Sequence, residues 1–85
     1  MSEKLVTTAY IHLEEKTYFD KLTAVANYAN RFESNIELEL NSKKVNGKSI
    51  VALTSFLTPS ELVTLRAVGR DSKEAVHQIK KIFMS

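Results

Sequence analysis

The 85-residue sequence contains no cysteine, only one proline and only two glycines. Without cysteine the chain can form neither a disulfide nor a thiolate metal site, and this composition is typical of proteins in a reducing compartment. No apolar run is long enough to span a bilayer. The polar start MSEKLVTTAY lacks the apolar segment of a signal peptide. We therefore expect a cytoplasmic protein that does not enter a membrane.

A large excess of one charge is also missing, because the formal net charge is +2. Nucleic-acid binding requires basic residues gathered on one face, and the basic residues here do not alternate with aromatic ones along a strand. Lys43, Lys44 and Lys48 form one small cluster, which is either a solvated turn or a patch that binds an anion or a partner. His12 and His77 are far apart and have no carboxylates around them, so we expect no metal and no cofactor.

Apolar periodicity predicts four strands and three helices in one domain over residues 1–85. Alternating apolar residues indicate strands at 5–13, 36–40 and 63–67, and 43–46 is a short return strand that forms a hairpin with 36–40. Spacings of three and four indicate a helix from Tyr18 to near 30–32, a short helix after Ser49 and a last helix after Asp71. The order β-α-β-β-α-β-α favours an α+β open-faced β-sandwich, with a four-stranded antiparallel sheet and helices on one face.

The same periodicity predicts which residues are buried. The first helix should bury one apolar stripe, and the last helix another; these are Leu22, Val25, Ala26 and Ala29, and Ala75, Val76, Ile79, Ile82 and Phe83. Ile50 and Leu53 should bury the short helix. Gly47, just before it, is expected to adopt a backbone conformation that other residues resist. The run DSKE at 71–74 is a helix-capping signal.

Two segments carry a family resemblance. Residues 29–50 read ANRFESNIELELNSKKVNGKSI, and residues 63–75 follow the pattern VTL-x-A-x-G-x-D-x-x-EA. Together with the order of elements, they resemble HPr, the histidine-containing phosphocarrier of the bacterial sugar phosphotransferase system, and the related HPr-like proteins of catabolite repression. The resemblance covers essentially the whole chain and implies the HPr-like form of the sandwich.

The phosphocarrier loop of the family does not match. A gapless alignment places Tyr18 at the phospho-accepting histidine, Asp20 at the arginine and Lys21 at the proline of the family motif. A phenol has an ordinary pKa near 10 and is a weak nucleophile at neutral pH. Asp20 adds negative charge where an incoming phosphoryl group needs positive charge. We therefore expect no catalytic residue and no enzymatic activity.

Ser49 has two interpretations. Serine is favoured as the N-cap of a helix for structural reasons alone. The resemblance instead aligns Ser49 with the serine that HPr kinase phosphorylates, and the phosphorylated form of such proteins binds the transcription regulator of catabolite repression. The alignment also brings Asp20 near Ser49, where its charge would repel a phosphate. The partner-binding surface predicted in this way comprises Tyr18, Phe19, Asp20, Lys21, Lys48, Ser49 and Val51.

The predicted function is that of a non-phosphotransferring regulatory or interaction protein, related to the sugar phosphotransferase system and carbon catabolite control and switched at Ser49. The alternative is a diverged phosphocarrier that uses another acceptor, for which His12 is the candidate. A third possibility is an assembly protein that pairs through an exposed sheet edge. We expect a monomer or a weak dimer whose partners are proteins, with neither nucleic acid nor membrane among them.

Overall fold

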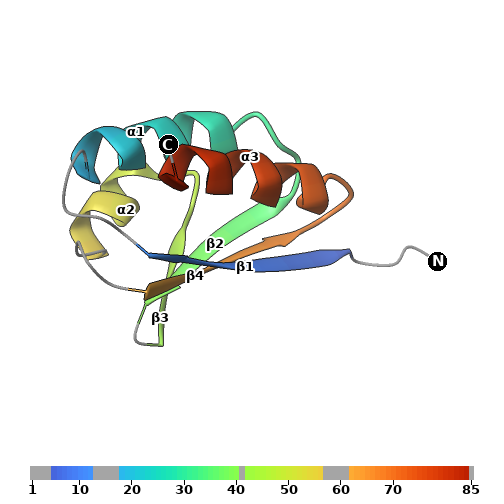
Figure 1. Cartoon of the computed structure of the whole chain (residues 1–85), viewed down its shortest axis with the longest axis horizontal. Helices are drawn as coiled ribbons and strands as arrows, with labels where there is room; N and C mark the ends of the chain where they lie inside the picture. Colours follow the sequence, from blue (N-terminus) through green and yellow to red (C-terminus); the bar gives the residue numbers. More distant parts are fainter. Residues whose placement is uncertain (1–4, 13–17, 41, 57–61, 85) are drawn as a thin grey trace.

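Four strands and three helices follow one another in the predicted order. The computed structural model describes residues 5–12, 18–40, 42–56 and 62–84, without the side chains at positions 18, 19, 40 and 56. The elements are β1 (Val6–His12), α1 (Tyr18–Ala29), β2 (Asn35–Leu40), β3 (Lys43–Asn46), α2 (Ile50–Phe56), β4 (Leu62–Val68) and α3 (Ser72–Met84). The alternation, the helical stripes and the turn before the return strand at 43–46 were together sufficient to place every element (Figure 1).

The strands form one antiparallel sheet in the order β1-β4-β2-β3. All three helices lie on one face of this sheet, and the other face is open (Figure 1). Pairing along one row brings Tyr10 opposite Thr64, Thr64 opposite Glu39 and Glu39 opposite Lys44. These four residues lie on the open face of the sheet. Because side chains alternate between the two faces of a strand, their neighbours along each strand point toward the helices. The predicted α+β open-faced sandwich is confirmed.

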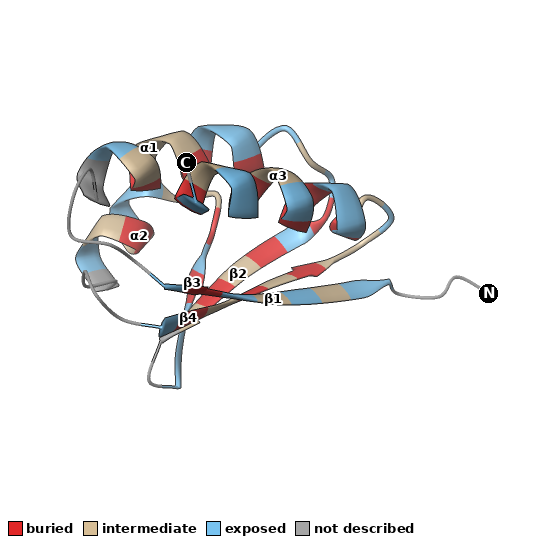
Figure 2. Cartoon of the chain, in the orientation of Figure 1, coloured by how far each residue is buried: buried red, intermediate tan, exposed pale blue. Residues whose placement is uncertain are grey.

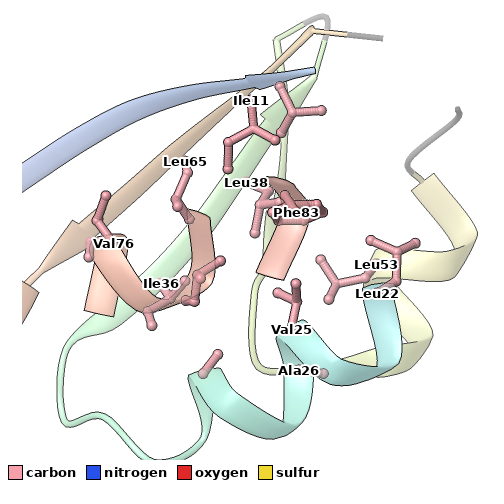
Figure 3. Close-up of a cluster of buried hydrophobic side chains, with 14 of the residues drawn as sticks. Ile11, Leu22, Val25, Ala26, Ile36, Leu38, Leu53, Leu65, Val76 and Phe83 are labelled. Atoms are coloured by element: carbon pink, nitrogen blue, oxygen red, sulfur yellow. The ribbon is translucent and has the colours of Figure 1, made fainter. Parts of the chain in front are cut away.

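The core lies between the sheet and the helices (Figure 2). The stripe predicted for α1 is fully buried, and in α3 all but Ile82, which is partly buried, lie in the core. Figure 3 shows the side chains of Leu22 and Val25 pointing toward Leu53 of α2. The burial prediction was wrong for Ile50, which is 39% exposed. A helix of seven residues makes about two turns, and Leu53 at its centre is fully buried.

The two glycines serve different purposes. Gly69 has a φ of +150°, and a Cβ atom there would lie 2.8 Å from the Ser34 Cα. Gly47, in contrast, does not have a positive φ, so the prediction of an unusual backbone conformation was wrong. A Cβ atom at Gly47 would lie 2.6 Å from the Ile36 Cγ2, so this glycine is needed because the chain passes close to β2.

Asp71 connects the start of α3 to the segment that follows α1. Its backbone carbonyl accepts the first helical hydrogen bond, from the Ala75 amide at 2.9 Å, as the capping signal predicted. Its carboxylate accepts hydrogen bonds from the Glu33 amide at 2.9 Å, the Ser34 amide at 3.0 Å and the Ser34 hydroxyl. The hydrogen bond from Ser34, with those from the two amides, lowers the pKa of Asp71 below its ordinary value.

Candidate functional site

Ser49 is the N-cap of α2. Its hydroxyl oxygen accepts a hydrogen bond from the Ala52 amide at 3.2 Å, and its carbonyl accepts one from the Leu53 amide at 3.0 Å. The first of these satisfies an amide that has no partner within the helix. The predicted capping role is thus confirmed. It does not compete with a second role, because the side chain is only half-buried and lies at the surface of the domain.

The start of α2 is attached to the C-terminal end of α1. The Asn30 side-chain amide donates to the Ala26 carbonyl at 2.8 Å and to the Lys48 carbonyl at 2.9 Å. The Lys48 ammonium donates to the Phe32 carbonyl at 2.8 Å. A cation at this position is favourable, because the end of a helix carries partial negative charge. These contacts fix the position of Ser49 relative to α1.

Asn30 was not identified from the sequence. The signal available was a polar residue directly after the apolar stripe of α1, and such a residue is also common where no second segment is bound. Lys48 was identified from the sequence, but its charge was expected either to be solvated in a turn or to lie beside a phosphate on Ser49. The structure gives its ammonium a structural partner, the Phe32 carbonyl.

An apolar surface lies beside Ser49. Val51 is 74% exposed, and Ile50 before it is also exposed. Two adjacent β-branched apolar side chains at the surface of a short helix are consistent with a contact site for another protein. Ser49, Ile50 and Val51 therefore form a small surface, which we call the α2 surface, with a modifiable hydroxyl at its edge.

The residues predicted at the start of α1 fall into two groups. Asp20 is exposed, whereas the Lys21 ammonium donates to the Phe83 carbonyl at 3.0 Å and so faces α3. Tyr18 and Phe19 form the first turn of α1, and their side chains lie outside the described part of the chain. Their predicted role stays a prediction.

Asp20 and the segment before Ser49 are attached to opposite ends of α1. Ser49 follows Lys48, which is bound to the C-terminal end of α1, whereas Asp20 lies in the first turn of that helix. Asp20 and Asn30 are ten positions apart, which corresponds to roughly 15 Å along a helix axis. The repulsion that the alignment predicted between Asp20 and a phosphate on Ser49 stays a prediction.

Other kinds of site receive no support from the described residues. His12 and His77 are both exposed, as predicted. Among the residues that the structure describes, no three histidine, cysteine or acidic side chains come together as metal ligands would. No helix in this part of the chain is both long enough and apolar enough to cross a membrane.

Comparison with known proteins identifies the family. A family model described as "PTS HPr component phosphorylation site" matches residues 21–85, which is most of the chain. The chain belongs to the HPr family. The HPr-like protein Crh of Bacillus subtilis (strain 168) is 46% identical to it over 52 residues, which are 60% of this chain and 61% of Crh. The aligned region thus covers less than two thirds of that relative.

Solved structures of HPr-family proteins share the fold over a larger part of the chain. The histidine-containing phosphocarrier protein of Mycoplasma superposes with a TM-score of 0.85 at 25% identity, covering 92% of each chain. A crystal structure of Bacillus subtilis Crh, described as a swapped dimer, superposes with a TM-score of 0.71 at 31% identity and covers 99% of this chain and 93% of that chain. These likenesses support the HPr-like architecture and a relation to the phosphotransferase system.

The HPr-family match begins at Lys21. It contains Ser49 and the α2 surface, and it leaves out Tyr18 and Asp20, which the alignment placed in the phosphocarrier loop. The part of the chain that the family model matches therefore includes the N-cap serine.

Proposed function

We propose that this protein is a regulatory member of the HPr family that does not transfer phosphate and that binds a protein partner through the α2 surface. In this proposal, phosphorylation of Ser49 switches the binding. The observation that carries the proposal is the position of Ser49: its half-buried hydroxyl begins α2, directly beside the 74% exposed Val51. A modification here changes the charge of an exposed apolar surface.

A phosphate on Ser49 would alter the surface while leaving the fold in place. Phosphorylation adds roughly −1.5 to −2 charges at pH 7. The Ser49 oxygen already accepts a hydrogen bond from the Ala52 amide, and a phosphate oxygen can accept the same bond. The hydrogen bonds from the Asn30 side-chain amide to the Lys48 carbonyl and from the Lys48 ammonium to the Phe32 carbonyl do not involve the Ser49 side chain. A phosphate on Ser49 therefore does not have to break them. The switch would be electrostatic and local.

The partner that fits such a surface presents an apolar contact for Val51 and positive charge for the phosphate. Within the family, the resemblance suggests HPr kinase as the modifying enzyme and the transcription regulator of catabolite repression as the partner. We place this function in the cytoplasm, where the phosphotransferase system operates. Tyr18, Phe19, Asp20 and Lys21, at the start of α1, and Lys48 are proposed to extend the contact beyond the α2 surface.

Phosphate transfer through the start of α1 is not part of this function. We propose that Tyr18 stands where the family has its phospho-accepting histidine. Its phenol is a weak nucleophile at neutral pH. The exposed Asp20 nearby would disfavour the developing negative charge of a transferred phosphoryl group. We therefore propose that the protein is a binding partner and has no enzymatic role.

Incubation with HPr kinase and ATP, followed by intact mass and peptide mapping, tests the proposal. We expect one phosphate, located on Ser49 and absent from Ser49→Ala. Ser55→Ala is the matched control, because Ser55 is an exposed serine of the same helix. Labelling that persists in Ser49→Ala, or no labelling while an HPr positive control is modified, would reject Ser49 as the switch. A parallel incubation with phosphoenolpyruvate and the general phosphotransferase enzyme should give no phosphorylated product.

A further inference from the structure

A cavity of about 300 Å³ lies on the hairpin of β2 and β3, at the edge of the sheet that β3 forms (Figure 1). Polar side chains from both strands and from the segment after β3 line it; these are Asn35, Glu37, Lys44, Asn46 and Lys48. Ile36 and Val45, which belong to the core, also contribute to its wall. A space of this volume is at the lower end of the range for sites that hold small molecules.

The register of the hairpin brings a carboxylate and an ammonium group to one face. The Gly47 amide donates to the carbonyl of Ile36 at 2.7 Å, so these two opposed residues form a hydrogen-bonded pair. The next pair, Glu37 and Asn46, is therefore of the non-hydrogen-bonded kind, in which opposed side chains lie closest. Lys44 shares the face of Asn46, because side chains two positions apart point to the same side. Glu37 and Lys44 are thus diagonal neighbours across the hairpin.

The charged groups of Glu37 and Lys44 are available to a ligand. Arg66 and Glu39 lie opposite them in the sheet. Within the described part of the chain, however, neither the Glu37 carboxylate nor the Lys44 ammonium forms a hydrogen bond or an ion pair. Glu37 is nevertheless half-buried, so its carboxylate is held at the cavity. One negative and one positive group therefore face the same small space.

Amide groups adjoin these two charges. The side-chain oxygen of Asn46 accepts a hydrogen bond from the Lys48 amide at 2.9 Å, and its NH2 group can donate to a ligand. Asn35 adds a second carboxamide to the lining, which can both donate and accept. The Lys48 ammonium uses one of its three donors on the Phe32 carbonyl. The cavity thus combines an anion, cations and groups that bind either kind of polar atom.

A ligand that pairs with both charges must itself carry both. Its ammonium group would bind the Glu37 carboxylate, and its carboxylate would bind the Lys44 ammonium and the Asn46 NH2 group. In an α-amino acid the two groups are attached to one carbon atom, and the side chains of diagonal neighbours can reach such a compact molecule from both sides. A simple anion would leave Glu37 unpaired, and a simple cation would leave Lys44 unpaired. We infer that this cavity binds a small zwitterion of the α-amino acid type.

This inference does not rest on the regulatory proposal. Ser49, Ile50 and Val51, which form the α2 surface, are not among the residues that line the cavity. Lys48 lines it, but the two charges that select the ligand are those of Glu37 and Lys44. A failed kinase experiment would leave this site unaffected, and absence of amino-acid binding would leave the phosphorylation of Ser49 unaffected.

A titration followed by two-dimensional amide NMR of the full chain tests the inference. L-Alanine is the zwitterionic probe; propionate lacks its ammonium group, and ethylamine lacks its carboxylate. We expect saturable shifts with L-alanine at the start of β2, at the end of β3 and at Lys48. Propionate and ethylamine should each bind at least about threefold more weakly, because each can use only one of the two charges. Equally tight binding of either one, or shifts spread over the whole surface without saturation, would overturn the inference.

Two matched pairs of variants assign the charges. Glu37 and Glu39 are both half-buried glutamates of β2, and of these two only Glu37 lines the cavity. Lys43 and Lys44 are both exposed lysines of β3, and of these two only Lys44 lines it. Glu37→Gln and Lys44→Gln should each raise the Kd for L-alanine by about threefold to fivefold, whereas Glu39→Gln and Lys43→Gln should change it by less than about twofold. Glu37→Gln should leave the Kd for propionate unchanged. Equal effects within either pair would contradict the assignment of the site.

Discussion

The hydrogen bonds of Asp71 predict a specific loss of stability in Asp71→Asn. The carboxylate accepts three hydrogen bonds, two of them from Ser34, which is 1% exposed. An asparagine has one acceptor oxygen, so its amide nitrogen would face either the Glu33 or the Ser34 donors. Losing one charge-assisted hydrogen bond and weakening the others should cost about 2 kcal/mol of unfolding free energy. For a domain of this size, that lowers the Tm by roughly 10 °C.

The effect should depend on pH in a defined direction. The pKa of Asp71 is lower in the folded protein than its ordinary value of 3.8, so the folded state holds this proton less tightly than the unfolded state. The stabilisation is complete above the unfolded pKa and disappears as the pH falls through the lowered, folded pKa. The difference between the wild type and Asp71→Asn should therefore be constant above about pH 5 and shrink below pH 4.

Urea unfolding followed by circular dichroism measures this difference at each pH. Asp20→Asn is the matched control, because it makes the same chemical change at an exposed position of α1, and it should change the unfolding free energy by less than about 0.5 kcal/mol. If Asp71→Asn were as stable as the wild type at pH 7, or if its deficit did not change on acidification, the carboxylate of Asp71 would not stabilise the fold in this way.

Two further substitutions test local structure. Gly69→Ala should destabilise by about 2–4 kcal/mol, because alanine is strained at a φ of +150° and its Cβ would lie 2.8 Å from the Ser34 Cα; a deficit below about 1 kcal/mol in urea unfolding would contradict this. Ser49→Ala should cost about 1 kcal/mol through loss of the hydrogen bond from the Ala52 amide. Ser49→Asp should retain most of that stability, and an equal loss in both variants would argue against the cap.

Most of the fold could be predicted from the sequence because each element has a strong local pattern. Leu38 alternates with the glutamates on either side of it, and Val25 and Ala26 belong to a stripe of helical spacing; in each case the apolar side chain is the buried one. Burial of Ile50 was mispredicted because spacing alone does not say which apolar side chains of a short helix face the core.

Contacts between distant segments could not be predicted in the same way. Asp71 lies 37 positions from Ser34, and Lys48 lies 16 positions from Phe32. Asp71 fits the local role of a helix cap, and Lys48 fits that of a solvated lysine. The neighbouring sequence fully explains both roles. Lys21 shows the same limit, because it reaches the Phe83 carbonyl only when α1 packs against α3. Periodicity predicted the two helices but not which of their side chains come together.

In the proposed function, a phosphate on Ser49 changes which protein the α2 surface binds. The most direct measurement compares the affinity of the catabolite-repression transcription regulator for two forms of this protein: one with phosphoserine incorporated at position 49 by synthesis, and one unmodified. We expect the phosphorylated form to bind with a Kd lower by about tenfold or more. Val51→Asp should remove this gain without lowering the Tm, because Val51 is exposed. The same Kd for both forms would show that Ser49 is not the switch.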